Sequence, residues 1–163
     1  MTLNQDELKG SGVLDGENNT ARQRWMGILA RATGDEISGL LAGIEPQPSY
    51  ELIKRPETGT LMLEGRAGGA GQRFNMGEAT MTRCVIRLSD GTMGFSYALG
   101  RDRKKAEQSA VIDALLQSAT SETNSLHVGI TAMEQAQAEA RDRASRKAAA
   151  TKVNFFTLVR GDG

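Results

Sequence analysis

Residues 79–99 read ATMTRCVIRLSDGTMGFSYAL, two runs of alternating character on either side of Asp90-Gly91. An Asp-Gly pair between such runs is a strong signal for a two-residue β-hairpin turn. The pair predicts strands over residues 79–88 and 92–99 of one antiparallel hairpin. Its register places three pairs on one face, which we expect to be the core: Leu88 with Met93, Ile86 with Phe95, and Cys84 with Tyr97.

The same register predicts the composition of the other face of the hairpin. It sets arginines beside small residues there: Arg87 with Gly94, Val85 with Ser96, and Arg83 with Ala98. Small neighbours leave space above the two arginines. A ligand, an acidic side chain of a partner or a neighbouring helix could fill that space, and these three alternatives stay open.

The rest of the chain predicts an α+β fold. Apolar residues recur at helical spacing in residues 20–32 and 35–43, which indicates two N-terminal helices. Two further strands are expected at Tyr50 to Arg55 and Thr60 to Arg66, giving a four-stranded, mainly antiparallel sheet. After Gly100-Arg101 a long helix, capped by Asp102, is expected to pack on the sheet. Within it we interpret Glu107 and Asp113 as solvated or ion-paired residues.

The two ends of the chain differ from this centre. Residues 1–19 form a polar leader that we expect to be disordered, followed by a single α+β domain over 20–163. A long helix is predicted for 126–150, after a linker at 121–125, with a thin apolar side and an extended tail behind it. We expect residues 126–163 to dock on a partner subunit, although the tail could instead fold back as an edge strand. The partner-binding candidates are Val153, Phe155, Phe156, Leu158 and Arg160.

A glycine- and arginine-rich block over residues 57–83 is the other distinctive stretch. Formal net charge is zero, yet residues 66–105 hold eight basic side chains against three acidic ones. Glycine permits close backbone approach, and the arginine fork matches phosphate or carboxylate oxygens. The candidates for binding a ligand or anion are Arg66, Gly68, Gly69, Gly71, Arg73, Arg83, Arg87 and Arg101.

Composition argues against several classes of function. One cysteine, Cys84, and one histidine, His127, are too few for an intrachain disulfide or for a zinc or iron–sulfur site built from this chain alone. We expect Cys84 to be a small buried hydrophobe and His127 a surface or packing residue. No catalytic template fits, so no catalytic residue is predicted. No apolar run approaches the about 20 residues of a membrane helix, so a cytoplasmic location is expected.

Several motifs together resemble the PhnG family, the G subunit of the bacterial carbon–phosphorus lyase system. The likeness runs from about residue 20 to the end of the chain. It rests on Arg22-Gln23-Arg24-Trp25-Met26, Leu29-Ala30, Glu57-Thr58-Gly59, the 66–83 block, Ser96-Tyr97, Gly100-Arg101-Asp102, Ala106-Glu107 and the segment from Val153 to Asp162.

The resemblance implies a place in organic phosphonate catabolism. It implies a subunit of α-D-ribose 1-methylphosphonate 5-triphosphate synthase, a multisubunit transferase in which methylphosphonate replaces the adenine of MgATP. The implied partners are the H, I and J subunits of the core complex, with the L subunit for activity. The resemblance also implies that MgATP is a substrate of the complex, that an iron–sulfur cluster belongs to the J subunit, and that this chain alone binds no cofactor.

Three hypotheses for the role of the chain follow. The main one is structural: the C-terminal helix and tail complete the assembly, and catalysis lies elsewhere. The competing one is direct binding of the triphosphate or phosphonate by the glycine–arginine loop. A nucleic-acid-binding module is the third, although the chain has few aromatic residues and no nucleic-acid motif.

Overall fold

The computed structural model describes residues 20–67, 70–117 and 121–151 of the chain. Its described helices are a first one over residues 20–31, then α2 (Gly34–Ala42), α3 (Arg103–Leu116) and α4 (Ser121–Ala150). The strands are β1 (Tyr50–Arg66), β2 (Arg73–Leu88) and β3 (Met93–Leu99), which pair in the order β1-β2-β3, all antiparallel. The predicted α+β class is confirmed.

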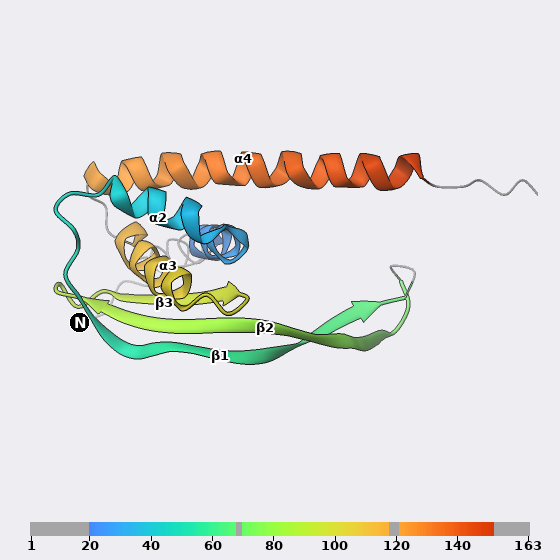
Figure 1. Ribbon diagram of the computed structural model, residues 1–163, viewed down its shortest axis with the longest axis horizontal. Coiled ribbons are helices and arrows are strands. Elements are labelled where there is room, and N and C mark those ends of the chain that lie inside the picture. The colour runs from blue at the N-terminus through green and yellow to red at the C-terminus, as the bar shows by residue number, and fades with distance from the viewer. Residues whose placement is uncertain (1–19, 68–69, 118–120, 152–163) are drawn as a thin grey trace, which may run out of the picture.

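The helices lie on one face of the sheet. Figure 1 shows α3 directly against the strands, α2 and the first helix next to it, and α4 on top. The predicted helical spacing of the first helix is confirmed, since Trp25, Ile28, Leu29 and Ala32 are all buried. Ile37 and Leu41 of α2 are buried as well, and Thr33 closes a capping box with Glu36 at its start.

The prediction of four strands is wrong by one, because the two expected before residue 67 form the single strand β1. The register of β1 shifts between Leu52 and Lys54 and again between Lys54 and Glu57, and Pro56 lies at the second shift. Proline donates no hydrogen bond and is confined to sheet edges and bulges. Strand β1 is an edge strand, so its outer side tolerates Pro56 and the strand continues.

The predicted register of the β2–β3 hairpin is also wrong, by one residue. The turn holds three residues, because Leu88 donates its N–H to the carbonyl of Thr92 at 2.9 Å and Gly91 takes a positive φ of 93°. A one-residue slip turns every side chain of a strand to the other face. Gly94, Ser96 and Ala98 are therefore buried beside Cys84 and Ile86, whereas Phe95 and Tyr97 lie on the open face of the sheet.

Close contact between α3 and β3 explains this register. A Cβ on Gly94 would lie 2.0 Å from the carbonyl oxygen of Ala110 and 2.8 Å from the Cβ of Ala114. The alanine-rich side of α3 thus needs small residues beneath it, and only the observed register supplies them. Of the three alternatives for the space beside the small residues, the neighbouring helix is the one observed. It fills that space on the face of the sheet opposite the arginines.

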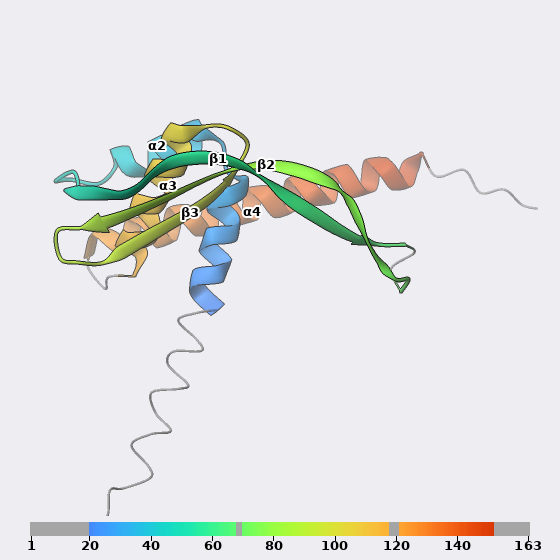
Figure 2. The same cartoon turned by 90° about the horizontal axis from the view of Figure 1, so that it is seen from below.

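Two parts of the chain project from the rest, which we call the body. One is the arm, residues 61–78, where β1 and β2 continue as a two-stranded ribbon beyond β3, α2 and α3 (Figures 1 and 2). The other is the projecting half of α4, residues 139–150, every one of which is exposed. Helix α4 begins at Ser121, so the predicted linker at 121–125 is wrong. Its first half docks through Leu126, Ile130 and Met133.

Candidate functional site

The central part of the glycine–arginine block, residues 66–73, forms the tip of the arm. Arg66 and Arg73 are partners in the β1–β2 register, and Gly71 donates its N–H to the carbonyl of Ala67 at 2.9 Å. Arg73 also lies 3.4 Å from a carboxylate oxygen of Glu64. Gly68 and Gly69 lie outside the described residues. The block is thus the connection of a long hairpin.

Two other candidates, Arg83 and Arg87, are paired on the open face. Arg83 binds Glu57 at 3.1 Å and Arg87 binds Glu51 at 2.7 Å, each with its register partner on β1. Hydrogen bonds from Lys54 and Arg83 hold the pKa of Glu57 below its usual value. Exposed pairs of this kind add little to stability, because solvent screens them. They nevertheless give both arginines a carboxylate partner within the chain.

Arg101 has a different environment. It lines a hollow of about 480 Å³ with Arg103 and with residues of β1 and β2, namely Thr58, Gly59, Thr60 and Thr80. We call this the basic hollow. Among the described residues, neither Arg101 nor Arg103 forms an ion pair. The structure therefore separates Arg101 from the other candidates and gives it Arg103 as a neighbour.

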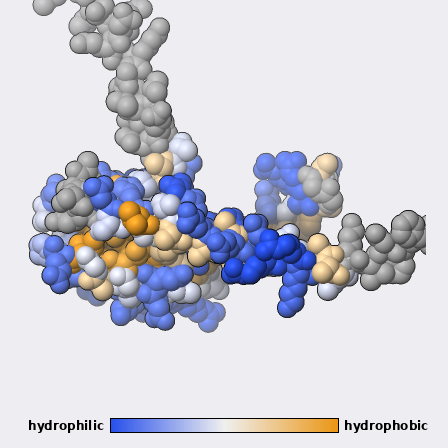
Figure 3. All heavy atoms as spheres, turned by 90° about the horizontal axis from the view of Figure 1, so that it is seen from above, coloured by the Kyte–Doolittle hydropathy of each residue, from blue (hydrophilic) through white to orange (hydrophobic). Residues whose placement is uncertain are grey.

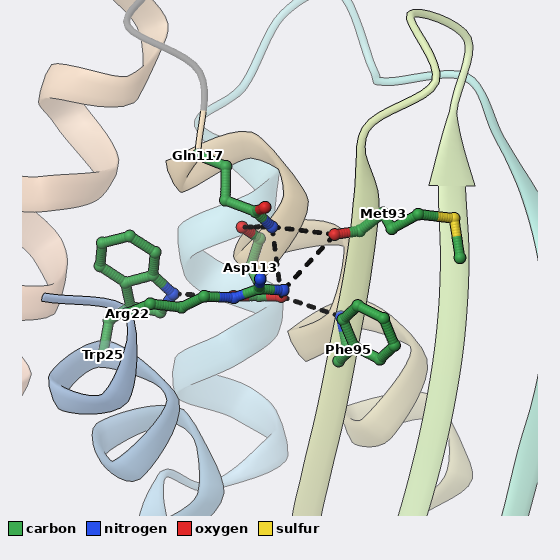
Figure 4. Close-up of polar contacts among 6 residues, drawn as sticks. All are labelled: Arg22, Trp25, Met93, Phe95, Asp113 and Gln117. Carbon is green, nitrogen blue, oxygen red and sulfur yellow. Dashed lines mark hydrogen bonds and ion pairs between the residues drawn. The ribbon is translucent and has the colours of Figure 1, made fainter. Parts of the chain in front are cut away.

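The most connected polar group of the body, the Asp113 cluster, was missed by the sequence analysis as a site (Figure 4). Asp113 lies on α3 with a side chain that is 0% exposed. Its carboxylate accepts hydrogen bonds from Arg22 Nη2 at 2.7 Å, Trp25 Nε1 at 2.9 Å and the N–H of Phe95 at 2.9 Å. Gln117 Nε2 lies 3.4 Å from the same carboxylate and donates to the carbonyl of Met93 at 2.9 Å. The interpretation of Asp113 as an ion-paired residue is confirmed.

This cluster holds the fold together and leaves little capacity for acid–base chemistry. Both oxygens of Asp113 already accept hydrogen bonds, so their acceptor positions are occupied within the protein. The bonds to Phe95 and Met93 occupy backbone groups of β3, an edge strand. One carboxylate thereby joins the first helix, α3 and the sheet. The sequence contains one signal for this cluster, a lone aspartate inside the apolar run 110–116. Its partner Arg22 is 91 residues away, so the pairing itself could not be read from local sequence.

Other predicted roles can be checked directly. Burial raises the pKa of the Cys84 thiol to about 11, which confirms the prediction of a small buried residue. His127 is exposed and lies edge-on to Trp25, with ring centroids 6.0 Å apart. Asp102 caps α3 by accepting from the N–H of Lys105 at 2.9 Å, as predicted.

The side chain of Lys105 also links α3 to the first helix. Its ammonium donates to the carbonyl of Ala30, and desolvation lowers its pKa.

The described part of the chain contains no group of three or more His, Cys, Asp or Glu side chains arranged to hold a metal ion. Within the same residues, none of the helices combines the length and apolarity that crossing a membrane requires.

Large apolar side chains are exposed along the arm. They come from both strands and reach 65% exposure at Met76; the others are Leu61, Met62, Leu63 and Phe74. The projecting half of α4 is hydrophilic instead, as its blue surface in Figure 3 shows. Its contact with the body ends near Gln137, which donates to the carbonyl of Ile28 at 3.0 Å. The predicted tail candidates, from Val153 to Arg160, lie outside the described residues.

These features define a small α+β protein with a compact body, two projections and a basic hollow at the base of the arm. Residues 20–161 match the family described as phosphonate metabolism protein PhnG. The chain belongs to the PhnG family. It is 42% identical over 143 residues to the α-D-ribose 1-methylphosphonate 5-triphosphate synthase subunit PhnG of Rhizobium meliloti (strain 1021), covering 86% of this chain and 90% of the relative. The resemblance stated from the motifs is confirmed.

Proposed function

We propose that this chain is a subunit of an α-D-ribose 1-methylphosphonate 5-triphosphate synthase and that its role there is mainly structural. The name of the Rhizobium meliloti relative, which matches over 86% of this chain, supports the activity. In the proposed reaction, methylphosphonate displaces adenine from the ribose of MgATP. The proposed companions are the H, I and J subunits, with the L subunit for activity and an iron–sulfur cluster in the J subunit.

The exposed arm is the observation that most favours a structural role. Five large apolar side chains between Leu61 and Met76 are more than two-fifths exposed on a two-stranded ribbon. An isolated two-stranded hairpin is marginally stable in water, and exposed apolar patches usually mark interfaces. A partner subunit that covers the arm would remove this apolar surface from water.

The C-terminal region is the second part of the proposed interface. In sequence, the projecting half of α4 is followed by the tail. The tail contains Phe155 and Phe156 and is the more apolar of the two chain ends. We propose that residues 126–163 lie partly on the body and partly on a companion subunit. The chemistry of the reaction would then come from the companions, because no catalytic template fits the sequence of this chain.

Co-purification tests this role. The chain is expressed with the H, I and J subunits in two shortened forms, one without residues 153–163 and one without residues 2–19. The second is the matched control, because the family match begins only at residue 20. We expect loss of the tail to reduce recovery of the companions severely and loss of the leader to leave it unchanged. A complete complex without the tail would contradict the docking role of the tail.

Growth tests the activity. A strain that lacks its own G subunit should use methylphosphonate as sole phosphorus source when it carries the full chain. If it grows on phosphate but not on methylphosphonate despite good expression of the chain and its companions, the proposed activity is wrong.

A further inference from the structure

The basic hollow lies at the base of the arm, between the start of α3 and strands β1 and β2. Thr60 and Thr80 are register partners on β1 and β2, at the base of the arm, and Thr58 is paired with Thr82 next to them. Arg101 and Arg103 flank the start of α3 and line the same hollow. Residues with hydroxyl and guanidinium side chains therefore line one open space of about 480 Å³.

The loop that carries Arg101 is fixed to the sheet. Gly100 has a φ of 92°, which turns the chain sharply between β3 and α3. Its N–H donates to the carbonyl of Thr80 at 2.9 Å, and its carbonyl accepts from the hydroxyl of Thr82 at 2.8 Å. Both bonds hold Arg101 beside the threonines.

Charge in the hollow is not neutralised as it is on the open face. Arg83 and Arg87 each have a glutamate partner, whereas Arg101 and Arg103 have no ion pair among the described residues. The intervening Asp102 directs its carboxylate to the N–H of Lys105. The nearest acidic side chain along β2 is Glu78, two residues before Thr80 and outside the lining. Two uncompensated guanidinium groups are a strong attraction for an oxyanion.

We infer that the basic hollow binds a tetrahedral phosphorus oxyanion, with Arg101 and Arg103 as charged donors and Thr60 and Thr80 as hydroxyl donors. Two sources of this group, a triphosphate chain and a phosphonate, share the same chemistry. The choice of phosphorus over other anions rests on the proposed function. The hollow differs from the glycine–arginine tip of the arm, and of the candidates predicted from sequence it retains only Arg101.

Titration of the full-length chain tests the inference with two probes, inorganic tripolyphosphate and methylphosphonate. The main variant is R101A/R103A, and the matched control is R83A/R87A, which removes the same charge from paired arginines on the open face. We expect the first to weaken binding of the preferred probe by about tenfold or more and the second to leave it nearly unchanged. The probe with the higher affinity identifies the source.

A second variant separates the contribution of a hydroxyl group to binding from the contribution of charge. T80V removes one hydroxyl without altering charge, and we expect it to weaken binding by about threefold to tenfold. Unchanged binding in R101A/R103A, an equal loss in R83A/R87A, or failure of the unaltered chain to bind either probe would overturn the inference. Co-purification of the companion subunits is measured separately. Failure of phosphate binding can therefore be distinguished from failure of assembly.

Discussion

The Asp113 cluster and the arm differ in where their side chains find contacts. Those of the cluster are bonded within the chain, whereas the apolar side chains of the arm are exposed. Around Asp113, donors from the first helix and β3 converge on one fully buried carboxylate. Along the arm, Met62, Phe74 and Met76 are about half exposed or more, and no other described element buries them. The difference indicates that the body is stabilised by its own contacts and that the arm presents surface for another molecule.

The largest expected effect comes from removing the anchor of the body. Asp113→Ala would leave the guanidinium of Arg22 and the indole N–H of Trp25 without their acceptor. We expect a loss of about 3 kcal/mol in the free energy of unfolding, measured by denaturant titration. Met76→Ala on the arm is the matched control and should change it by less than about 0.5 kcal/mol. Equal losses in both would remove the distinction between body and arm.

Gly94 offers a smaller test of the close contact between α3 and β3. Gly94→Ala places a methyl group 2.0 Å from the carbonyl oxygen of Ala110, so helix and strand must separate. We expect destabilisation of about 1–3 kcal/mol. Gly39→Ala on α2 is the control, because its Cβ would meet no atom within 4 Å, and helix propensity predicts a gain of about 0.5–1 kcal/mol. A harmless Gly94→Ala would contradict the observed register.

Alkaline pH should weaken the body through Cys84. The folded thiol keeps its proton up to a pKa of about 11, against 9.0 for an ordinary cysteine. The folded state therefore binds more protons between these values, so the free energy of unfolding falls as pH rises from about 9 to about 11 and is unaffected by this group below that range. Denaturant titration across the range, with Cys84→Ala as control, measures the contribution. Rapid alkylation of the native thiol near pH 8 would count against its burial.

Part of this architecture could be predicted from local patterns. The helical spacing around Trp25 and the Asp102 cap depend on neighbouring residues, and both predictions are confirmed. The β2–β3 register could not be settled locally, because Asp90-Gly91 suits both a two-residue turn and a three-residue turn with Gly91 at positive φ. The decision comes from α3, whose small side chains lie directly over Gly94.

The candidate site shows the same limit. Arginine and glycine in one block predicted an anion-binding loop, but strand pairing places only residues 66–73 at the tip of the arm and brings Arg83 and Arg87 to glutamates on β1. Arg101 and Thr60 are 41 positions apart, so their convergence depends on the hairpin and on the turn at Gly100. Arg22 and Asp113 are likewise distant in sequence, and only packing brings them together as an ion pair.

Hydrogen exchange of backbone amides, compared between the free chain and the assembled complex, tests the central claim most directly. The account predicts strong protection of α3 and β3 in both states, and protection of residues 61–78 that is weak in the free chain and rises markedly on assembly. An arm that is as protected in the free chain as in the complex, or that stays unprotected after assembly, would contradict the claim that a partner covers it.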